Sequence, residues 1–470
     1  MIYSKITPFN ADVYTPVELY LSLRNHYRKT CLLESNEYQS RTNSKSYIGI
    51  QPILEIKIKD FEVVITKEDV IKCFQLDNNQ DVVEQIDELL KSYSFENKSI
   101  QGNGFLGRFG FEFALLTESQ IKKEKSHLGL PDIHLFVFQY IIVIDHFTNN
   151  GQIISNSFSK TELETLDCSE LLKRKSYTEF PFQVVGKELF EYDDIEFGHK
   201  VIKAIEHCKR GDVFQLVLSN SFRQKFFGDD FQVYRELRRL NPSPYLFYFD
   251  FEEYRLFGSS PEAQLVVKKG KAEIHPIAGT VLKTGDYNKD LQRIEFLQSD
   301  EKENAEHTML VDLARNDLSK DCINVKVEKY KELQYFSHVI HLVSKVTGQL
   351  ENQPMIKVLN HSFPAGTLSG TPKTKALELI TKMEDSTRDF YGGAIGLIGS
   401  DGSLNMAIVI RSMLSLNSEL HYRAGAGIVI NSIVENEVNE VHHKLKAVRT
   451  AIKMADEVCK AKVKIELNFS

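Results

Sequence analysis

The sequence predicts an α+β fold in which helices pack outside antiparallel sheets, and three observations support this. Residues 46–58 and 133–145 are rich in β-branched and aromatic side chains, which is typical of strands. Residues 16–30 favour a helix, with Thr15 as its N-cap and Pro16 at its first position. After about residue 190, short strand patterns and longer helical patterns mix.

The later part of the chain contains four helical patterns and several strands. We expect a capping box at 432–435 to open the last helix. We expect polar stretches at 119–131 and 154–180 to be surface loops, the second separating an N-terminal region (1–180) from a catalytic region (190–465). The predicted helices are 197–209, 288–315, 372–383 and 433–460, and the predicted strands are 213–220, 245–250, 254–258, 263–268, 392–399, 405–413 and 420–430.

Bulk properties favour a cytoplasmic enzyme. The 470 residues carry a net charge of −7, which gives no broad electrostatic reason to bind nucleic acid or anionic lipid. The six cysteines form no CxxC pair, so we expect reduced thiols and not a zinc site. The N-terminus lacks the basic and apolar segments of a signal peptide, and the most apolar stretch is too short to cross a bilayer.

Two glycine-rich segments resemble nucleotide-binding loops. Residues 102–107 fit GxGxxG, but polar residues precede them and strand-like residues follow, so we expect no dinucleotide site. Residues 366–373 lack the Walker spacing, and we expect a tight turn into the helix that Pro372 starts.

Two helical segments each carry a Glu-x-x-Glu pair. Residues three or four apart share a helix face, so Glu303 and Glu306 project together, as do Glu437, Glu440 and Lys444. Each pair alone could be a solvated acidic face. Together they could hold a hard cation, and all-oxygen ligation favours Mg²⁺. A di-iron carboxylate bundle is the alternative, which the many intervening strands disfavour.

Polar residues also lie inside apolar strands. Alternation predicts that Gln215 is buried, as a structural amide or a ligand contact. Arg411 ends an apolar stretch, and a buried arginine matches a carboxylate. Gly425 and Gly427 would let backbone N–H groups approach an anion closely.

These segments together resemble the anthranilate synthase component I family of chorismate-utilising enzymes. The resemblance covers most of the chain and is densest from about 205 to 450. It implies an orthogonal antiparallel β-sandwich flanked by helices, with two intertwined subdomains and chorismate in the cleft between them. The matching segments include GDVFQLVLS, NPSPYLFYF, HPIAGT, DEKENAEHTMLVDLARNDL, FPAGTLSGTPKTKALELI, YGGAIG and RAGAGIV.

The resemblance also implies roles for individual residues. Glu306 and Glu440 resemble direct Mg²⁺ ligands, and Glu303 and Glu437 the carboxylates that support them. Glu262 resembles the general acid that protonates the departing C4 hydroxyl. The remaining implied catalytic residues are His341, associated with pyruvate elimination, Lys444 on the metal-site helix, and Gln215.

The implied substrate contacts fall into two groups. Gly279, Thr280 and Gly427 would contact the ring carboxylate of chorismate, and Tyr391 with Arg411 would hold the enolpyruvyl carboxylate. Gly425 is a further implied substrate-binding residue. Isochorismate and salicylate synthases carry a water-activating lysine where this chain has Gln215, and aminodeoxychorismate synthases often carry a nucleophilic lysine where it has Ala278. Both differences favour ammonia as the nucleophile and anthranilate as the product.

Regulation and partnership follow from the same resemblance. The segment 32–35 resembles a tryptophan-feedback motif. With no Gly-x-Cys-x-Gly elbow in the sequence, the resemblance implies a separate glutaminase subunit that supplies ammonia. The implied effector residues are Glu34, Ser35, Asn241, Pro244, Tyr245, Leu246 and Phe247.

The sequence therefore predicts a Mg²⁺-dependent enzyme that converts chorismate and ammonia to anthranilate and pyruvate in tryptophan biosynthesis. Alternatives within the family are an aminodeoxychorismate, isochorismate or salicylate synthase. An alternative of another class is a catalytically silent tryptophan-binding regulator, against which the intact acidic residues argue.

Overall fold

The structure is a computed structural model that describes residues 1–35, 44–77, 80–118, 121, 126–173, 177–335, 339–351 and 353–468. Side chains at 278, 280, 282, 287, 301, 302, 339 and 461–468 are outside this description. None of the helices described within these ranges is long and apolar enough to cross a membrane.

Antiparallel pairing joins strands from the whole chain into one network. Its centre is the pairing of β3 (Lys45–Lys59) with β7 (Ile133–Asp145). From β3, one branch continues through β2 (Thr30–Glu34), β11 (Tyr245–Asp250), β12 (Arg255–Ser260), β21 (Ser412–Leu416), β22 (Glu419–Val429) and β10 (Gln215–Gly228). From β7, another continues through β6 (Gly104–Phe109), β19 (Ala394–Gly399), β20 (Leu404–Ile408), β13 (Ala263–Lys268), β14 (Lys271–Ile274) and β17 (Val339–Leu350). Strands from before residue 180 and after residue 190 therefore share ladders.

Shorter pairings extend this network. The remaining described strands are β1 (Tyr3–Asn10), β4 (Glu62–Lys67), β5 (Val70–Gln75), β8 (Asn150–Ser157), β9 (Phe182–Phe190), β15 (Ile277–Leu282), β16 (Cys322–Tyr335) and β18 (Gly370–Thr371).

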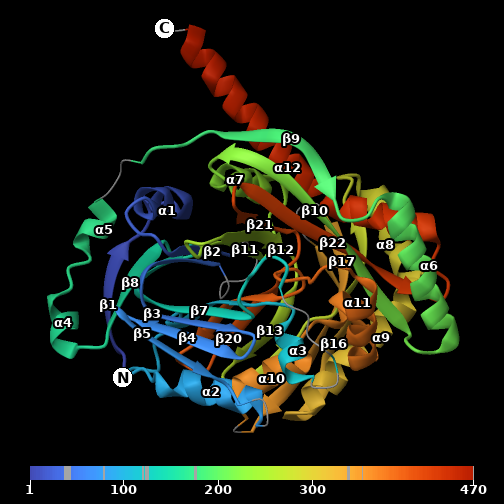
Figure 1. Ribbon diagram of the computed structural model, residues 1–470, viewed down its shortest axis with the longest axis horizontal. Coiled ribbons are helices and arrows are strands. Elements are labelled where there is room, and N and C mark those ends of the chain that lie inside the picture. Colours follow the sequence, from blue (N-terminus) through green and yellow to red (C-terminus); the bar gives the residue numbers. More distant parts are fainter. Residues whose placement is uncertain are drawn as a thin grey trace.

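Helices cover the outside of the strand network (Figure 1). The C-terminal helix α12 packs on β22, α6 and α7, and its far end projects from the body, while α9 packs on β15, β16 and β17. The described helices are α1 (Pro16–Arg24), α2 (Val82–Ser92), α3 (Phe113–Thr117), α4 (Lys160–Thr165), α5 (Ser169–Lys173), α6 (Asp194–Arg210), α7 (Phe231–Leu240), α8 (Tyr287–Ser299), α9 (Glu301–Ser319), α10 (Met355–Ser362), α11 (Lys373–Met383), α12 (Val434–Asn468) and the 3₁₀ turn η1 (Gly366–Leu368).

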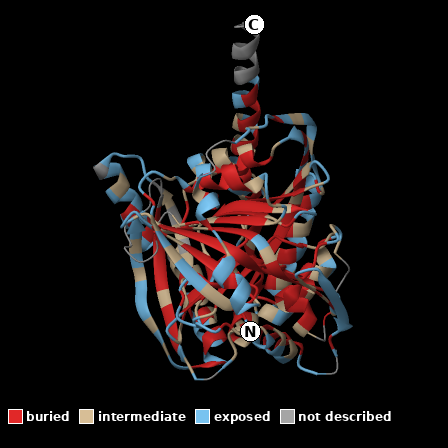
Figure 2. Cartoon of the chain, turned by 90° about the vertical axis from the view of Figure 1, so that its left-hand side faces the viewer, coloured by how far each residue is buried: buried red, intermediate tan, exposed pale blue. Residues whose placement is uncertain are grey.

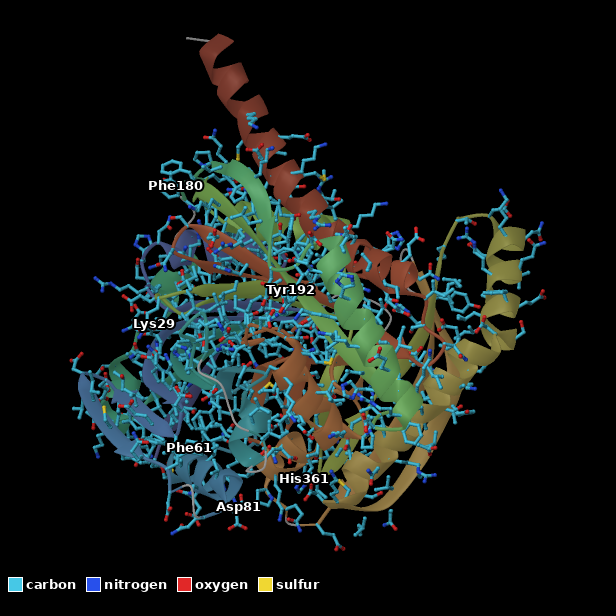
Figure 3. All side chains as sticks on the ribbon, turned by 45° about the vertical axis from the view of Figure 1, so that its right-hand side comes forward. Lys29, Phe61, Asp81, Phe180, Tyr192 and His361 are labelled. Carbon is cyan, nitrogen blue, oxygen red and sulfur yellow. The ribbon has the colours of Figure 1, made fainter. Side chains whose placement is uncertain are left out.

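Local sequence explains where α6 begins and ends. Asp193 and Glu196 form a reciprocal capping box at its start, and Gly211 ends it in the left-handed conformation. Just before the helix, the hydroxyl of Tyr192 accepts a hydrogen bond from the backbone N–H of Asp385 at 2.7 Å (Figure 3). Helix α6 is thereby tied to the segment that follows α11.

Burial is concentrated in the strands (Figure 2). The sequence lacks tryptophan, so phenylalanine and tyrosine supply the largest aromatic groups of the core. Tyr20, Phe231, Tyr234, Tyr248 and Phe257 pack ring against ring, with centroids 4.9 to 6.5 Å apart. This cluster fixes α1 and α7 against β11 and β12.

The α+β class is confirmed, and several elements match their predictions closely. The strands predicted at 133–145, 245–250 and 263–268 are β7, β11 and β13. Residues 104–107 of the GxGxxG segment lie in strand β6, and the segment opens no helix. A Cβ at Gly107 would lie 2.1 Å from the His134 carbonyl oxygen, so close strand packing explains that glycine.

Several predicted elements are wrong in extent, among them the strand at 213–220, which is β10 and continues to Gly228. The helix at 16–30 ends at Arg24, where Asn25 caps it. The helix at 288–315 is two helices, because Asp300 is extended and its carboxylate accepts the backbone N–H of Glu303 at 2.8 Å as an N-cap. The strand at 405–413 breaks at Arg411, whose φ of 49° lies outside the β region. The stretch 154–180 includes the end of β8 and two short helices.

The two predicted helix starts near the site also need correction. Helix α12 begins at Val434, so Ser432 precedes its N-cap, and the Ser432 hydroxyl instead donates to Glu437 Oε1 at 2.7 Å. Pro372 is the N-cap of α11, so this helix begins at Lys373, one residue later than predicted. The orthogonal sandwich and the division into two regions stay predictions.

Candidate active site

The acidic residues of α9 and α12 converge on one place. The side-chain amide of Gln215 donates to Glu306 Oε1 at 3.1 Å, and the ammonium of Lys444 lies 2.7 Å from Glu440 Oε1. Although burial opposes its charge, the pKa of Lys444 is raised by Glu440, by Tyr391 and by Glu306. Carboxylates from both helices therefore act on the same cation.

The two supporting carboxylates have other neighbours. Glu437 is buried and accepts the Ser432 hydroxyl. Glu303 lies beside Gly279, where an added Cβ would come within 3.3 Å of Glu303 Oε2. Gly279 has a φ of +74°, a conformation that glycine adopts without strain.

The small residues of β22 leave room for Gln215 and Lys444. A Cβ at Gly427 would lie 2.8 Å from the Gln215 amide nitrogen. The Gly425 carbonyl accepts a hydrogen bond from Lys444 at 2.8 Å. Gln215 is buried as predicted, and among the described residues its Oε1 has no hydrogen-bond partner. A buried acceptor without a partner indicates a place for water or a ligand.

Glu262 is the carboxyl best suited to donate a proton. It follows β12, and the Thr367 hydroxyl donates to its Oε1 at 3.2 Å. Burial raises the pKa of Glu262 to about 7, although Thr367 and the positive charges of Lys444 and Arg411 oppose the shift. A carboxyl with such a pKa is partly protonated at neutral pH, as a general acid requires.

Arg411, His341 and Tyr391 complete the predicted group. Burial lowers the pKa of Arg411, and Glu262 opposes that change. Burial also lowers the pKa of His341 to about 4, helped by Arg411 and opposed by a hydrogen bond to the Gly279 backbone, so the imidazole is neutral at pH 7. Tyr391 is buried, which raises its pKa.

The structure describes only the backbone of Thr280. It pairs with His341 between β15 and β17, which brings the predicted carboxylate contact next to the histidine. The side chains of Thr280 and Ala278 lie outside the described part.

The donor chemistry of the site fits a divalent cation. Two carboxylates, Glu306 and Glu440, act on the single ammonium of Lys444, which leaves an excess of negative charge supplied by oxygen ligands. Glu440 is still 44% exposed and can turn toward an ion. In the ranges that the structure describes, no three His, Cys, Asp or Glu side chains stand close enough together to form a complete metal site. The Mg²⁺ ligands therefore stay a prediction.

Sequence reasoning missed a buried ion pair behind the site. Arg388 donates to Glu384 Oε1 at 2.6 Å and to Oε2 at 2.9 Å, and also to the carbonyls of Leu368 at 2.5 Å and Val217 at 2.8 Å. Glu384 accepts the backbone N–H of Ser219 at 2.8 Å. The pair thus ties β10, which carries Gln215, to the loop that carries Thr367. The i, i+4 spacing of the two residues was the only available signal.

The predicted effector residues divide into two neighbouring groups. Glu34 is buried in β2, opposite Leu246, and its carboxylate is held by Arg238 at 2.9 Å and by the Tyr234 hydroxyl at 2.7 Å. Ser35 continues the strand, where its backbone N–H donates to the Lys45 carbonyl. Sequence reasoning missed both Arg238 and Tyr234.

The second group surrounds the start of β11. The Asn241 side chain lies 3.3 Å from the Ser259 hydroxyl. Pro244, Leu246 and Phe247 are buried beside the half-buried Tyr245. Residues 36–43, which follow the first group in sequence, are outside the described ranges. The tryptophan-binding role of both groups stays a prediction.

Comparison with known proteins agrees with this geometry. Residues 29–450 match the family of chorismate binding enzymes. Anthranilate synthase component 1 of Aquifex aeolicus is 34% identical over 96% of this chain and 94% of its own. The crystal structure of anthranilate synthase component I from Streptococcus pneumoniae is 30% identical, covers 93% of this chain and 98% of its own, and has a TM-score of 0.74.

A more distant structure shares only the fold. The menaquinone-specific isochorismate synthase of Escherichia coli has a TM-score of 0.75, covers 96% of this chain and 95% of its own, and is 18% identical. The chain belongs to the family of chorismate-binding enzymes. Within that family, the chain is 34% and 30% identical, along nearly its whole length, to two proteins named anthranilate synthase component 1 or component I.

The buried pair of Arg388 and Glu384 yields a stability prediction. Glu384→Gln should lower the free energy of unfolding by about 3 kcal/mol, because it leaves the arginine charge buried without its counter-ion. Denaturant titration followed by circular dichroism measures the change. Lys382→Gln, which breaks the exposed Glu378–Lys382 pair on the preceding helix, is the control and should have little effect. Equal stability of the two variants would contradict the supporting role of the buried pair.

Proposed function

We propose that the chain is the chorismate-converting subunit of a cytoplasmic anthranilate synthase, a lyase that forms anthranilate and pyruvate from chorismate and ammonia in tryptophan biosynthesis. The observation that carries this proposal is the neutral amide of Gln215 against Glu306. An amide cannot serve as the base that activates water, so ammonia is left as the nucleophile. The full-length similarity to anthranilate synthase component 1 proteins supports the same reaction.

The proposed enzyme requires Mg²⁺. Glu306 and Glu440 would hold the ion, with Glu303 and Glu437 as the supporting carboxylates. When bound, the ion would act as a Lewis acid toward the ring carboxylate of chorismate. The backbones of Gly279, Thr280, Gly425 and Gly427 would contact that carboxylate.

Residues of the chain itself would bind the substrate, transfer the proton and balance charge. Arg411 and Tyr391 hold the enolpyruvyl carboxylate of a dianionic substrate, since a buried guanidinium pairs well with a carboxylate. Glu262 gives its proton to the C4 hydroxyl as that group departs. The neutral His341 lies next to Thr280 and is available during pyruvate elimination. Lys444 balances part of the carboxylate charge.

The proposed regulation and partner lie outside this site. Tryptophan would bind beside Glu34 and Asn241 and inhibit the enzyme. A separate glutamine amidotransferase would supply ammonia, consistent with the component 1 names of the relatives. Without that partner, the chain should use free ammonium salts only.

The reaction can be tested with the purified chain. Chorismate, Mg²⁺ and an ammonium salt should give fluorescent anthranilate, and EDTA should abolish it because the carboxylate cluster would lose its cation. Fluorescence and chromatography identify the product. Isochorismate or salicylate would assign the chain to the sister activities. Tight tryptophan binding without chorismate consumption would instead identify a silent regulator.

Gln215→Lys tests the discrimination between ammonia and water. The new ammonium would pair with Glu306 and disturb the metal site, so anthranilate formation should fall on the order of tenfold or more, equivalent to about 1.4 kcal/mol or more of barrier. Product analysis should detect some isochorismate. Gln183→Lys on the exposed strand β9 adds the same charge and should behave as the wild type. Unaltered rate and product in Gln215→Lys would remove this amide from the mechanism.

The raised pKa of Glu262 predicts a pH dependence. The carboxyl acts in its protonated form, so kcat/KM, measured at a constant concentration of unprotonated ammonia, should fall as the pH rises through about 7. Glu262→Gln should lower kcat by about 10² to 10⁴-fold and remove this descending limb. A limb that persists in the variant would show that another group causes it.

A further inference from the structure

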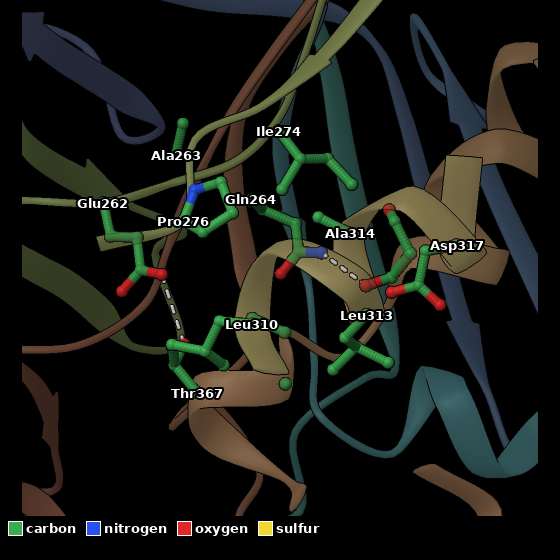
Figure 4. Close-up of a pocket in the computed structure, with 13 residues that line it drawn as sticks. Glu262, Ala263, Gln264, Ile274, Pro276, Leu310, Leu313, Ala314, Asp317 and Thr367 are labelled. Carbon is green, nitrogen blue, oxygen red and sulfur yellow. Dashed lines mark hydrogen bonds between the residues drawn. The ribbon is translucent and has the colours of Figure 1, made fainter. Parts of the chain in front are cut away.

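A cavity lies behind Glu262, on the side of α9 (Figure 4). Its volume is about 40 Å³. Glu262 and Thr367 stand at one end and Asp317 at the other, with Gln264 between them. The half-buried Leu313 lies along one side. The cavity therefore runs from Glu262, the predicted general acid, toward the C-terminal end of α9.

Gln264 presents an unsatisfied polar atom to this cavity. Its side chain is 2% exposed, and its Nε2 donates to the Ser362 carbonyl at 2.9 Å. Within the described ranges, Gln264 Oε1 has no hydrogen-bond partner. Buried polar atoms are usually bonded to protein or to ordered water, so this oxygen requires a donor that the chain does not supply.

The cavity has the size and lining to provide that donor. One water needs roughly 10–15 Å³ of such space and two to four polar partners, so about three waters fit. Truly empty cavities are lined by apolar groups, whereas this one meets two carboxyls, an amide and a hydroxyl. Hydrogen-bonded waters between two carboxyls form a continuous path along which protons can move.

Asp317 lies at the far end of the cavity, near the partly exposed Lys320. Its carboxylate is buried and accepts from Lys373 at 2.9 Å, and the partly exposed Lys320 lies 3.9 Å away. Burial raises the pKa of Asp317, while Lys373, Lys320 and His361 oppose the shift. At the near end, Thr367, Lys444 and Arg411 face Glu262.

We propose that this cavity holds a short water chain through which Glu262 regains its proton from solvent by way of Asp317, with Gln264 positioning the waters. The inference rests on the proposed function. In each turnover the ammonia nitrogen bonds to C2 as the C4–O bond breaks, and the Glu262 carboxyl gives one proton to the C4 hydroxyl, which leaves as water with the electron pair of the broken bond. The ammonium formed at C2 releases one proton to solvent, which balances the proton that Glu262 later regains. The Glu262 carboxylate then takes a proton from the nearest cavity water. That proton is replaced through the chain, Asp317 and solvent.

Ala314→Leu tests the route by filling the cavity without altering either carboxyl. Ala314 is buried on α9 and lines the cavity between Gln264 and Asp317. We expect kcat to fall roughly tenfold, since reprotonation of the general acid becomes limiting, with little change in KM for chorismate. The solvent deuterium isotope effect on kcat should rise, and added imidazole should restore part of the rate. Val311→Ile, which enlarges the core elsewhere on the same helix, should do none of this.

Other outcomes overturn the inference. An unchanged kcat, or a fall without a larger isotope effect or imidazole rescue, would show that the cavity only affects packing. If wild-type chain makes no anthranilate, the proposed function fails and the proton route fails with it. A high-resolution crystal structure of the wild type gives an independent readout if Ala314→Leu does not fold. Waters bonded to Gln264 Oε1 would support the route, and a dry cavity would contradict it.

Discussion

The site depends on the contacts that the ammonium of Lys444 makes with its neighbours. It bonds the Gly425 carbonyl at 2.8 Å and pairs with Glu440 at 2.7 Å, so it ties strand β22 to helix α12. Glu306 on α9 also raises the pKa of Lys444, and the positive charge of Lys444 acts to lower the pKa of Glu262. Opposite charges at short distance stabilise one another. Carboxylates of both helices act on the partly exposed ammonium of Lys444, and the site is built around this attraction.

The strand network makes this convergence possible. β10 and β22 pair along eleven residues, which places Gln215 beside Gly427 and below the first turns of α12. The pair of Arg388 and Glu384 then anchors β10 to the loop at Thr367. The amide that faces Glu306 and the hydroxyl that faces Glu262 are thus fixed by one buried charge pair. This arrangement restricts both groups to the orientations that the proposed chemistry uses.

Sequence patterns predicted the parts of the fold that depend on local periodicity. Strands β7, β11 and β13 matched to the residue because apolar residues, aromatic or aliphatic, make up most of each strand. The breaks at Asp300 and Arg411 were missed, since each depends on the backbone conformation of one residue: Asp300 is extended and caps α9 with its own side chain, and Arg411 has a φ of 49°. For the site, helical spacing together with family resemblance predicted the acidic residues on α9 and α12. Arg388, Arg238 and Gln264 were missed, because their importance comes from partners far away in the sequence.

The central claim is that carboxylates from α9 and α12 share one divalent ion. Anomalous diffraction from crystals soaked in Mn²⁺ as a substitute for Mg²⁺ tests it most directly. We expect a single strong peak between the carboxylates of Glu306 and Glu440. A map with no peak there, or with manganese bound only at other carboxylates, would contradict the claim.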